Sequence, residues 1–348
     1  MSPLILTLLL ISLGLGTTLT FASSHWLLAW MGLEINTLAI LPLMAQNHHP
    51  RAVEATTKYF LIQATAAAVI LFSSVTNAWL TGEWNILNTS SPLPIAIITI
   101  ALALKLGMAP VHLWLPEVLQ GLDLTTGLVL STWQKLAPFI LLMQIPSPAH
   151  NLLTAIAILS IAVGGWGGLN QTQLRKILAY SSIAHLGWVV VISQYGPQLA
   201  LFALLTYMLM TTPAFLLMKL TSATSINAMA LAWTKAPTVT ALAPLMLFSL
   251  GGLPPLTGFA PKWMIVNELT KQGLPILATT AAMLALLSLY FYLRLSYAAA
   301  LTITPNTPPA SAPWRFTPKR ASLLLAMTAF GSLALLPLTP SALALLNF

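Results

Sequence analysis

PLPIAIITIALALKLGMAPVHLWLPE, residues 92–117, is the most informative run in this 348-residue chain. It begins as a long apolar segment and then places Lys105, Gly107 and Pro110 where such a segment would continue as a helix. Proline removes a backbone donor and clashes with the preceding turn, so we expect the helix to open at Ala109-Pro110. The run therefore predicts an apolar helix that is broken part-way, with a lysine just before the break.

The composition of the whole chain is that of a membrane protein. Only 6% of the residues are charged and 57% are hydrophobic, whereas a soluble domain carries about 25% charged residues. Apolar runs of roughly 20 residues recur along the chain, which is long enough to cross a bilayer core as helices. The alternating pattern of a membrane β-barrel is absent. The predicted fold class is an all-α polytopic membrane protein.

Residue content and motifs exclude several kinds of site. The chain has no cysteine, which excludes disulfides, iron–sulfur clusters and thiolate metal sites. It contains no phosphate-binding loop, dinucleotide-binding fingerprint, nucleophile elbow or zinc-protease motif. We therefore expect no cofactor and no metal in this chain. The start, MSPLILTLLL, lacks a basic segment, so we expect the first apolar run to be a retained helix.

We predict about eleven spans, of which two are interrupted. The fourth is interrupted at Ala109-Pro110 and the ninth at GGLPPLTG, residues 251–258. The connection TITPNTPPASAPWRFTPKR, residues 302–320, is too rich in proline to be a helix. The predicted spans are residues 3–22, 26–45, 57–80, 92–121, 125–145, 151–169, 176–194, 198–221, 238–271, 275–301 and 322–346.

The basic residues lie mostly on one side of this predicted topology. The opposite side holds only Lys271, and three lysines fall inside spans. Such an asymmetry is what the positive-inside rule describes, and it places the N-terminus on the basic side and the C-terminus opposite. The net charge of +8 is thus a topology signal, and we expect no nucleic acid partner. The residues on the basic side are Arg51, Lys58, Arg175, Lys176, Lys219, Lys235, Arg294, Arg315, Lys319 and Arg320.

The opening run has a partner 145 residues later in the chain. Both copies lie in an interrupted span, and an odd number of spans separates them, which is typical of an inverted repeat. We expect helix breaks at Gly107, Pro110, Gly252 and Pro255, although a chance match and simple packing kinks are the alternatives. The predicted domains are a first repeat, 1–148, a second repeat, 149–302, and a proline-rich loop with a final helix, 303–348. The two copies read Gly107-x-x-Pro110-x5-Pro116-Glu117 and Gly252-x-x-Pro255-x5-Pro261-Lys262.

Four charged residues fall inside predicted spans: Glu34, Lys105, Lys135 and Lys262. A lone charge at the bilayer centre costs from about 3 kcal/mol to several-fold more. Static salt bridges are one explanation, but three lysines face one glutamate, so pairing alone leaves an excess of positive charge. Burial and repulsion between like charges both favour the neutral amine. We therefore expect these four residues to form a path for protons.

Two histidines are weaker candidates for the same path. His112 follows the first break, and His185 follows the hydroxyl-rich turn Tyr180-Ser181-Ser182. Either can relay protons near neutral pH, and a hydrogen-bonded structural role is an equal alternative. His48-His49 lacks the further ligands that a metal site needs.

Six blocks of sequence resemble the mitochondrial NADH dehydrogenase (ubiquinone) subunit 2 family, which comprises antiporter-like membrane subunits of respiratory complex I. The resemblance covers nearly the whole chain, and the blocks occur in the family's order. The blocks are SHWLLAWMGLEIN, ALKLGMAPVHLWLPEV, STWQKLAP, GGLNQTQLRKILAYSSIAHLGW, SLGGLPPLTGFAPKW and LYFYLRLSY.

The resemblance implies two inverted five-helix repeats plus a final helix, in the mitochondrial inner membrane with the basic side toward the matrix. It implies a contribution to proton pumping while NADH reduces ubiquinone elsewhere in the complex. NADH, flavin, iron–sulfur clusters and ubiquinone would be bound by other subunits. The implied partners are other membrane subunits, including neighbouring antiporter-like ones, and phospholipids.

The resemblance also implies roles for single residues. Glu34 would pair with Lys105 and set its proton affinity, Lys135 would occupy the centre of the axis, and Lys262 would stand at its far end. Bacterial relatives have additional helices at the N-terminus, and their absence here would leave that face open to lipid or to other subunits.

Three functions are compatible with the residues alone. The chain can be a proton-translocating subunit of a redox-driven complex, a stand-alone cation/proton antiporter, or a structural membrane scaffold. Composition and spacing do not separate the first two, whereas the resemblance favours the first. The surplus of buried cations argues against the third.

Overall fold

The computed structural model describes residues 2–46, 48–89, 91–145, 150–234, 236–300 and 322–346. Within these ranges the chain is helical and has no β-strand, only the isolated bridges His25–Asn85 and Gln173–Ser225. The chain divides into two compact units, Met1–Leu159 and Ser160–Phe348. The proline-rich connection predicted at residues 302–320 lies outside the described residues.

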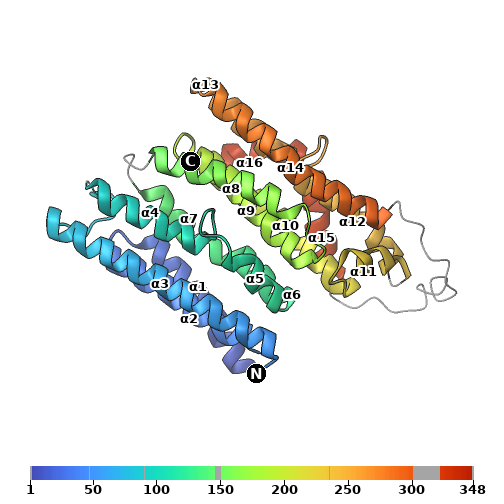
Figure 1. Cartoon of the computed structure of the whole chain (residues 1–348), viewed down its shortest axis with the longest axis horizontal. Helices are drawn as coiled ribbons and strands as arrows, with labels where there is room; N and C mark the ends of the chain where they lie inside the picture. Colours follow the sequence, from blue (N-terminus) through green and yellow to red (C-terminus); the bar gives the residue numbers. More distant parts are fainter. Residues whose placement is uncertain are drawn as a thin grey trace. The chain divides into compact units, whose positions relative to one another are not determined.

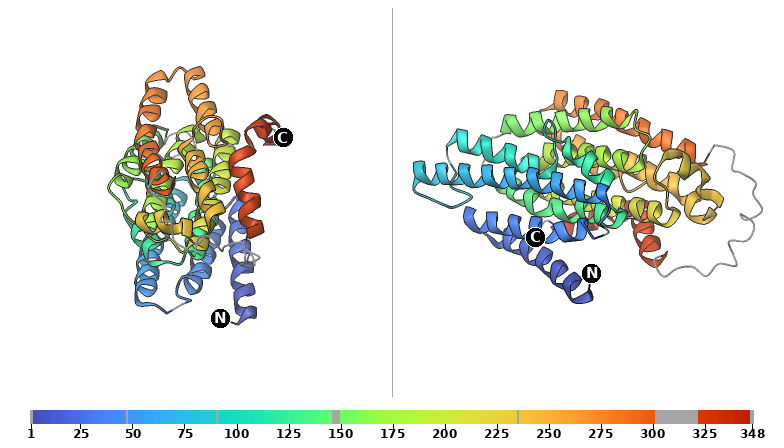
Figure 2. Two further views of the ribbon diagram at one scale, coloured as in Figure 1. Left: turned by 90° about the vertical axis from the view of Figure 1, so that its right-hand side faces the viewer. Right: turned by 60° about the horizontal axis from the view of Figure 1, so that its bottom comes forward.

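The first unit is a bundle in which α1 packs on α2, α2 on α3, and α3 on both α4 and α5. Figures 1 and 2 show α1, α2 and α3 side by side at the blue end of the chain. Its helices are α1 (Pro3–Ala22), α2 (Trp26–Met44), α3 (Pro50–Thr81), α4 (Pro92–Leu106), α5 (Trp114–Gly121), α6 (Leu124–Ser131), the 3₁₀ turn η1 (Trp133–Lys135), α7 (Leu136–Gln144) and the start of α8 (His150–Gly168).

The second unit is organised around α9, whose side chains are buried along almost its whole length. α9 contacts α10, α13 and α14, and α12 packs on α10 and α14. Its helices after α8 are α9 (Leu174–Ser193), α10 (Pro197–Thr221), α11 (Ile226–Ala230), η3 (Leu231–Thr234), α12 (Pro237–Gly251), α13 (Phe259–Lys271), α14 (Pro275–Ala300), α15 (Ser322–Ala334), η6 (Leu336–Leu338) and α16 (Thr339–Leu346).

The chain is a multi-pass membrane protein. In the described residues, 8 helices are long and apolar enough to cross a membrane, or 9 if the pair α15 and α16, bent by 68°, is one span. The helices Pro92–Leu106 and Val239–Gly251 are apolar but shorter. The all-helical membrane class is therefore confirmed, whereas the predicted count of about eleven spans is not.

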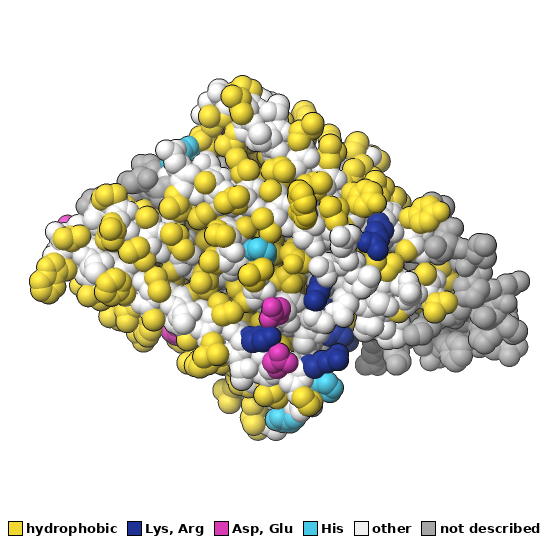
Figure 3. Space-filling view, in the orientation of Figure 1, with side chains coloured by type: hydrophobic (Ala, Val, Ile, Leu, Met, Phe, Trp, Pro, Cys, Tyr) yellow, Lys and Arg dark blue, Asp and Glu magenta, His cyan; other side chains and the backbone are white. Residues whose placement is uncertain are grey.

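Apolar side chains cover much of the exterior, as a lipid environment requires. Hydrophobic side chains dominate the face shown in Figure 3. Large examples are widely exposed, including Leu4 at 75%, Trp79 at 88% and Ile276 at 79%. A water-soluble protein would not expose apolar surface on this scale.

Both predicted helix breaks are present, and a left-handed glycine ends the helix at each. Gly107 has φ 76° and ψ 38°, and Gly252 has φ 80° and ψ 37°. In each break the glycine N–H donates to the carbonyl three residues back, and the next N–H to the carbonyl five residues back. This closing pattern satisfies carbonyls that the end of a helix frees. The Ala109–Pro110 and Pro254–Pro255 peptide bonds are both cis.

The two units also share a connection that sequence reasoning missed. In the first, Trp26 N–H donates to Trp84 O at 3.1 Å, and Ile86 N–H donates to Ser24 O at 3.0 Å. In the second, the same exchange joins the loop before α9 to the loop before α11 (Leu174 N–H to Thr224 O, 3.2 Å; Ile226 N–H to Thr172 O, 3.1 Å). Each pair of bonds holds together two loops at one end of its bundle.

The predicted span 125–145 is not one uninterrupted α-helix. It consists of α6, the 3₁₀ turn η1 and α7. Pro138 in α7 has no N–H to donate to the carbonyl of Gln134 four residues back. The winding therefore changes just before the proline, and Lys135 lies in that changed turn.

We expect Gly107→Ala to lower the stability of the protein by about 1–2 kcal/mol, because an L-residue is strained at a left-handed backbone position. An added Cβ would also lie 2.9 Å from Leu115 Cδ1. The matched control is Gly14→Ala in α1, where a Cβ meets nothing within 4 Å. The thermal unfolding midpoint of each purified variant in detergent checks this, and equal midpoints for both variants would contradict it.

Candidate functional site

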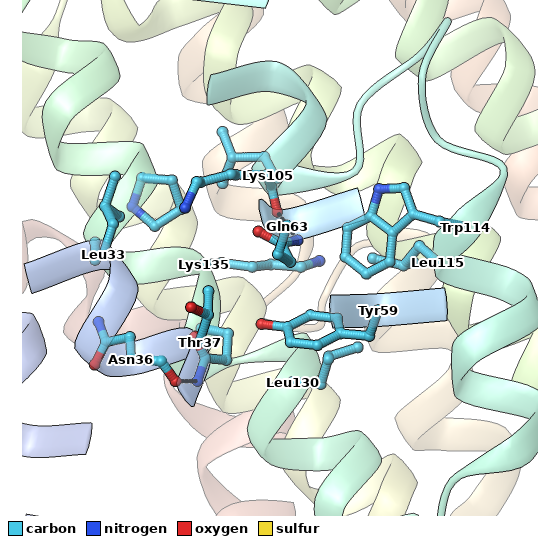
Figure 4. Close-up of a pocket in the computed structure, with 14 residues that line it drawn as sticks. Leu33, Asn36, Thr37, Tyr59, Gln63, Lys105, Trp114, Leu115, Leu130 and Lys135 are labelled. Carbon is cyan, nitrogen blue, oxygen red and sulfur yellow. Dashed lines mark hydrogen bonds between the residues drawn. The ribbon is translucent and has the colours of Figure 1, made fainter. Parts of the chain in front are cut away.

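A cavity in the first unit brings together two of the predicted site residues, Lys105 and Lys135. It offers about 20 Å³ of space to a water molecule. Figure 4 shows side chains from α2, α3, α4, α5 and the η1 region converging on it. Its lining includes two lysines and several uncharged polar side chains. The lining residues are Leu33, Asn36, Thr37, Tyr59, Gln63, Lys105, Leu106, Trp114, Leu115, Leu130, Gln134, Lys135, Ala137 and Pro138.

Lys105 lies in the last turn of α4, two residues before the break. Its side chain is 6% exposed, and its Nζ has no hydrogen-bond partner among the described residues. The amide of Gln63 donates to the Lys105 carbonyl at 3.4 Å. Trp114 Nε1, from beyond the break, donates to the Leu104 carbonyl at 3.1 Å. Side chains thus supply donors to the end of α4 where the helix stops.

Lys135 reaches the same cavity from a different element. It is 2% exposed and ends the 3₁₀ turn that precedes Pro138. Neighbouring Gln134 donates from Nε2 to the Asn36 carbonyl at 3.2 Å, which ties this turn to α2. The two breaks in regular α-winding, after Lys105 and at Lys135, therefore place two amines on one cavity.

Glu34 lies in α2 close to the cavity but does not line it. It is half-buried, and Thr37 Oγ1 donates to its Oε2 at 3.0 Å. Its charge acts electrostatically on Lys105 and on Tyr59. The family resemblance predicted an ion pair between Glu34 and Lys105, yet no hydrogen bond joins them. Glu34 acts on Lys105 at a distance instead.

A second cavity, in the other unit, is lined by Lys262 and His185. Lys262 Nζ donates at 2.7 Å to the carbonyl of Gly251, the last residue of α12. A cation at this position also interacts favourably with the negative end of the helix dipole. The matching position of the first break is Glu117, which is exposed and paired with Lys58 at 2.9 Å. The two breaks share a backbone conformation. The charged residue at the matching position binds the helix end in one break and forms an exposed ion pair in the other.

The histidines fall in different surroundings. His185 is 8% exposed and lies against Tyr207, with ring centroids 5.4 Å apart. His112 is 7% exposed, and its Nδ1 donates to the Pro110 carbonyl at 3.2 Å inside the first break. It does not line the cavity that holds Lys105. In the described part of the chain, no group of three or more His, Cys, Asp or Glu side chains could hold a metal ion.

Sequence reasoning missed the uncharged part of both cavities. Tyr59 and Gln63 lie on the cavity side of α3. One signal in the sequence could have found Tyr59. Counting 148 residues forward takes Glu34 to Ser182, Thr37 to His185 and Tyr59 to Tyr207. The same count takes His25 to Gln173, and each of these residues forms one of the two isolated bridges.

Comparison with known proteins identifies the family. The chain matches the family described as NADH:quinone oxidoreductase/Mrp antiporter, TM over residues 23–288, and NADH dehydrogenase subunit 2 C-terminus over residues 289–343. The NADH-ubiquinone oxidoreductase chain 2 of Oncorhynchus mykiss is 66% identical over 347 residues, 99% of each chain. That of Salmo salar is 66% identical over 348 residues, 100% of each chain.

The chain belongs to the NADH-ubiquinone oxidoreductase chain 2 family. This confirms the resemblance noted from the six sequence blocks. A chain in respiratory complex I from Thermus thermophilus with bound aureothin is 29% identical with a TM-score of 0.79, covering 95% of this chain and 79% of that one. A chain of the Mrp complex from a Dietzia species shares the fold at 17% identity, with a TM-score of 0.80 and coverage of 97% and 76%.

We expect Thr37→Val to lower stability by about 1 kcal/mol, because the half-buried carboxylate of Glu34 loses its hydroxyl donor while the side-chain volume is kept. Thr65→Val is the matched control, since Thr65 is exposed and donates only to a backbone carbonyl, that of Ile62. The measurement is again the unfolding midpoint in detergent. A midpoint that moves equally in both variants would mean that the Thr37–Glu34 bond contributes nothing.

Proposed function

We propose that this chain is a membrane subunit of respiratory complex I and carries protons across the mitochondrial inner membrane. The path runs through Glu34, Lys105, Lys135 and Lys262, with His185 beside Lys262. Electron transfer from NADH to ubiquinone takes place on other subunits, which bind the nucleotide, flavin, iron–sulfur clusters and quinone. The chain is thus part of an oxidoreductase without itself carrying a redox centre.

The observation that supports this most strongly is the cavity of the first unit. Two buried lysines line it, and among the described residues no carboxylate does. Two positive charges on one cavity would repel each other, and burial is costly for each. A scaffold would gain nothing from that arrangement, whereas a proton carrier uses it.

The same arrangement gives a mechanism for handing on a proton. A proton on Lys105 raises the cost of one on Lys135, so gain at one amine favours loss at the other. An ionised Glu34 supports the charge on Lys105 from a distance. Protonation of Glu34 withdraws that support and favours passage of the proton toward Lys135. Polar side chains on the walls can hold water between the two amines.

The resemblance of the two breaks supports the proposed repeats, 1–148 and 149–302, followed by residues 303–348. Left-handed glycines, their closing hydrogen bonds and the loop-to-loop connections recur in both units. The basic loops favour a matrix location for the N-terminus and an intermembrane-space location for the C-terminus. The partners are other membrane subunits, including antiporter-like ones, and phospholipids.

A stand-alone cation/proton antiporter is the second candidate, because the fold is shared with a chain of an Mrp complex. Identity of 66% over the full length of chain 2 relatives favours the first. Reconstitution of this chain alone separates the two candidates. Exchange of Na⁺ or K⁺ for protons in vesicles would favour the antiporter.

We expect Lys105→Met and Glu34→Gln to leave the complex assembled but to slow NADH-driven proton translocation roughly tenfold or more. Lys105→Met removes an amine that gains and loses the proton. Glu34→Gln removes the carboxylate that tunes this exchange. The rate of NADH:ubiquinone turnover should fall together with proton translocation if the two are tightly coupled. The assay uses the whole complex in sealed vesicles and measures protons translocated per electron.

The matched control is Lys271→Met, which removes an exposed lysine with only a long 3.8 Å contact to Glu268. It should pump at the wild-type rate. A normal ratio of protons to electrons in the assembled Lys105→Met complex would remove the basis for the proposed path.

A further inference from the structure

Tyr59 is a buried titratable side chain that the proposed path does not yet use. It comes from α3, lines the cavity of the two lysines and is 2% exposed. Its ring lies against Trp114, with centroids 5.8 Å apart at an angle of 59°. The ring is therefore held in place by packing, and only the hydroxyl is left to act.

The hydroxyl of Tyr59 makes no hydrogen bond to any of the described residues. Figure 4 shows it directed across the cavity toward Thr37, with Lys135 and Gln63 drawn above the ring. Buried tyrosine hydroxyls usually find a partner, because an unsatisfied one costs roughly 1–3 kcal/mol. An uncompensated polar group that faces a polar cavity indicates a function in that cavity.

The neighbours of this hydroxyl connect it to the acid as well as to the amines. Thr37 Oγ1 donates to both the backbone carbonyl and Oε2 of Glu34, at 2.9 and 3.0 Å. The Thr37 oxygen keeps its lone pairs free to accept. Glu34 acts electrostatically on Tyr59 and on Lys105 alike. The hydroxyl thus faces the threonine that holds Glu34, in the cavity that both lysines line.

We propose that the Tyr59 hydroxyl relays protons between the Glu34–Thr37 pair and the lysine amines of this cavity, with water completing the chain. The inference rests on the proposed function, which it deepens by naming a further residue of the path. A phenol suits this role because it donates and accepts at one atom. A carboxylate in its place would bind the lysine charges instead.

The step balances without ionising the tyrosine. A proton leaves the carboxylic acid of Glu34 and a proton arrives on a neutral lysine amine. In between, the Thr37 and Tyr59 oxygens, and a water molecule where a gap exceeds hydrogen-bond reach, each gain one proton as they give one up. Both hydroxyls end neutral and re-oriented, and one positive charge has moved to the amine.

The second unit carries the same residue at the corresponding place. Tyr207 lies 148 residues after Tyr59, is 1% exposed, and is hydrogen-bonded to Ser182. Ser182 and His185 stand where the first unit has Glu34 and Thr37, and His185 lines the cavity of Lys262. A buried tyrosine beside a polar pair of the preceding helix is therefore a repeated feature, although Tyr207 contacts the His185 ring and does not itself line the cavity of Lys262.

The test is Tyr59→Phe in the assembled complex, in sealed vesicles supplied with NADH and ubiquinone. The change removes one oxygen and keeps the ring against Trp114. We expect proton translocation to slow roughly tenfold, with an altered solvent deuterium isotope effect. The unfolding midpoint should stay the same, because the hydroxyl makes no hydrogen bond to a described residue and the ring packing is kept. Loss of pumping without loss of stability is a result that a structural role would not give.

Two further variants decide between the outcomes. Ser73→Ala removes a buried hydroxyl from the same helix outside the cavity and should pump normally. Lys105→Met is the reference for the path itself. If Lys105→Met fails to pump while Tyr59→Phe pumps at the wild-type rate, the relay is wrong and the path stands. If both pump normally, the proposed function is wrong, and the relay with it. A lowered midpoint in Tyr59→Phe that accounts for its slower pumping also overturns the relay.

Discussion

Backbone groups freed inside an apolar protein must find partners, and the site depends on how this chain meets that constraint. Both breaks end in a left-handed glycine whose N–H groups close onto the last turn. Side chains then supply further donors: Trp114 to the Leu104 carbonyl, and Lys262 to that of Gly251. Because the breaks are closed in this way, a lysine can lie at each one without an open helix end beside it.

The consequence is that three lysines lie where the regular α-helix is interrupted. Lys105 precedes one break, Lys135 ends a 3₁₀ turn, and Lys262 follows the other break. Cavities whose lining includes uncharged polar groups lie at these places. Ion pairs elsewhere, such as Lys58 with Glu54 and Glu117, are largely exposed and contribute little to stability.

The sequence predicted the class, both breaks and the burial of Lys105 and Lys135, because proline, glycine and isolated charges stand out in an apolar chain. The predicted count of about eleven spans is not confirmed, since α4 and α12 are short and α15 and α16 are bent. The 3₁₀ turn at Lys135 was missed, although Pro138, three residues later, lacks the N–H that a regular α-helix would need there. Tyr59 and Gln63 were missed because they are uncharged, although they belong to a row of polar side chains that recurs at helical spacing along the buried face of α3.

The separation of Glu34 from Lys105 makes sense for a path whose charges must change. A carboxylate in direct contact would hold the lysine proton firmly, since separating a buried ion pair is strongly unfavourable. Here Thr37 holds Glu34, and the charge of Glu34 reaches Lys105 only through space. Because the two groups do not touch, protonation of Glu34 can remove this influence without breaking an ion pair. An intermediary such as Tyr59 is needed because the carboxyl group of Glu34 does not touch the amine of Lys105. The gap between these two groups lets each change its charge, and it also requires a relay.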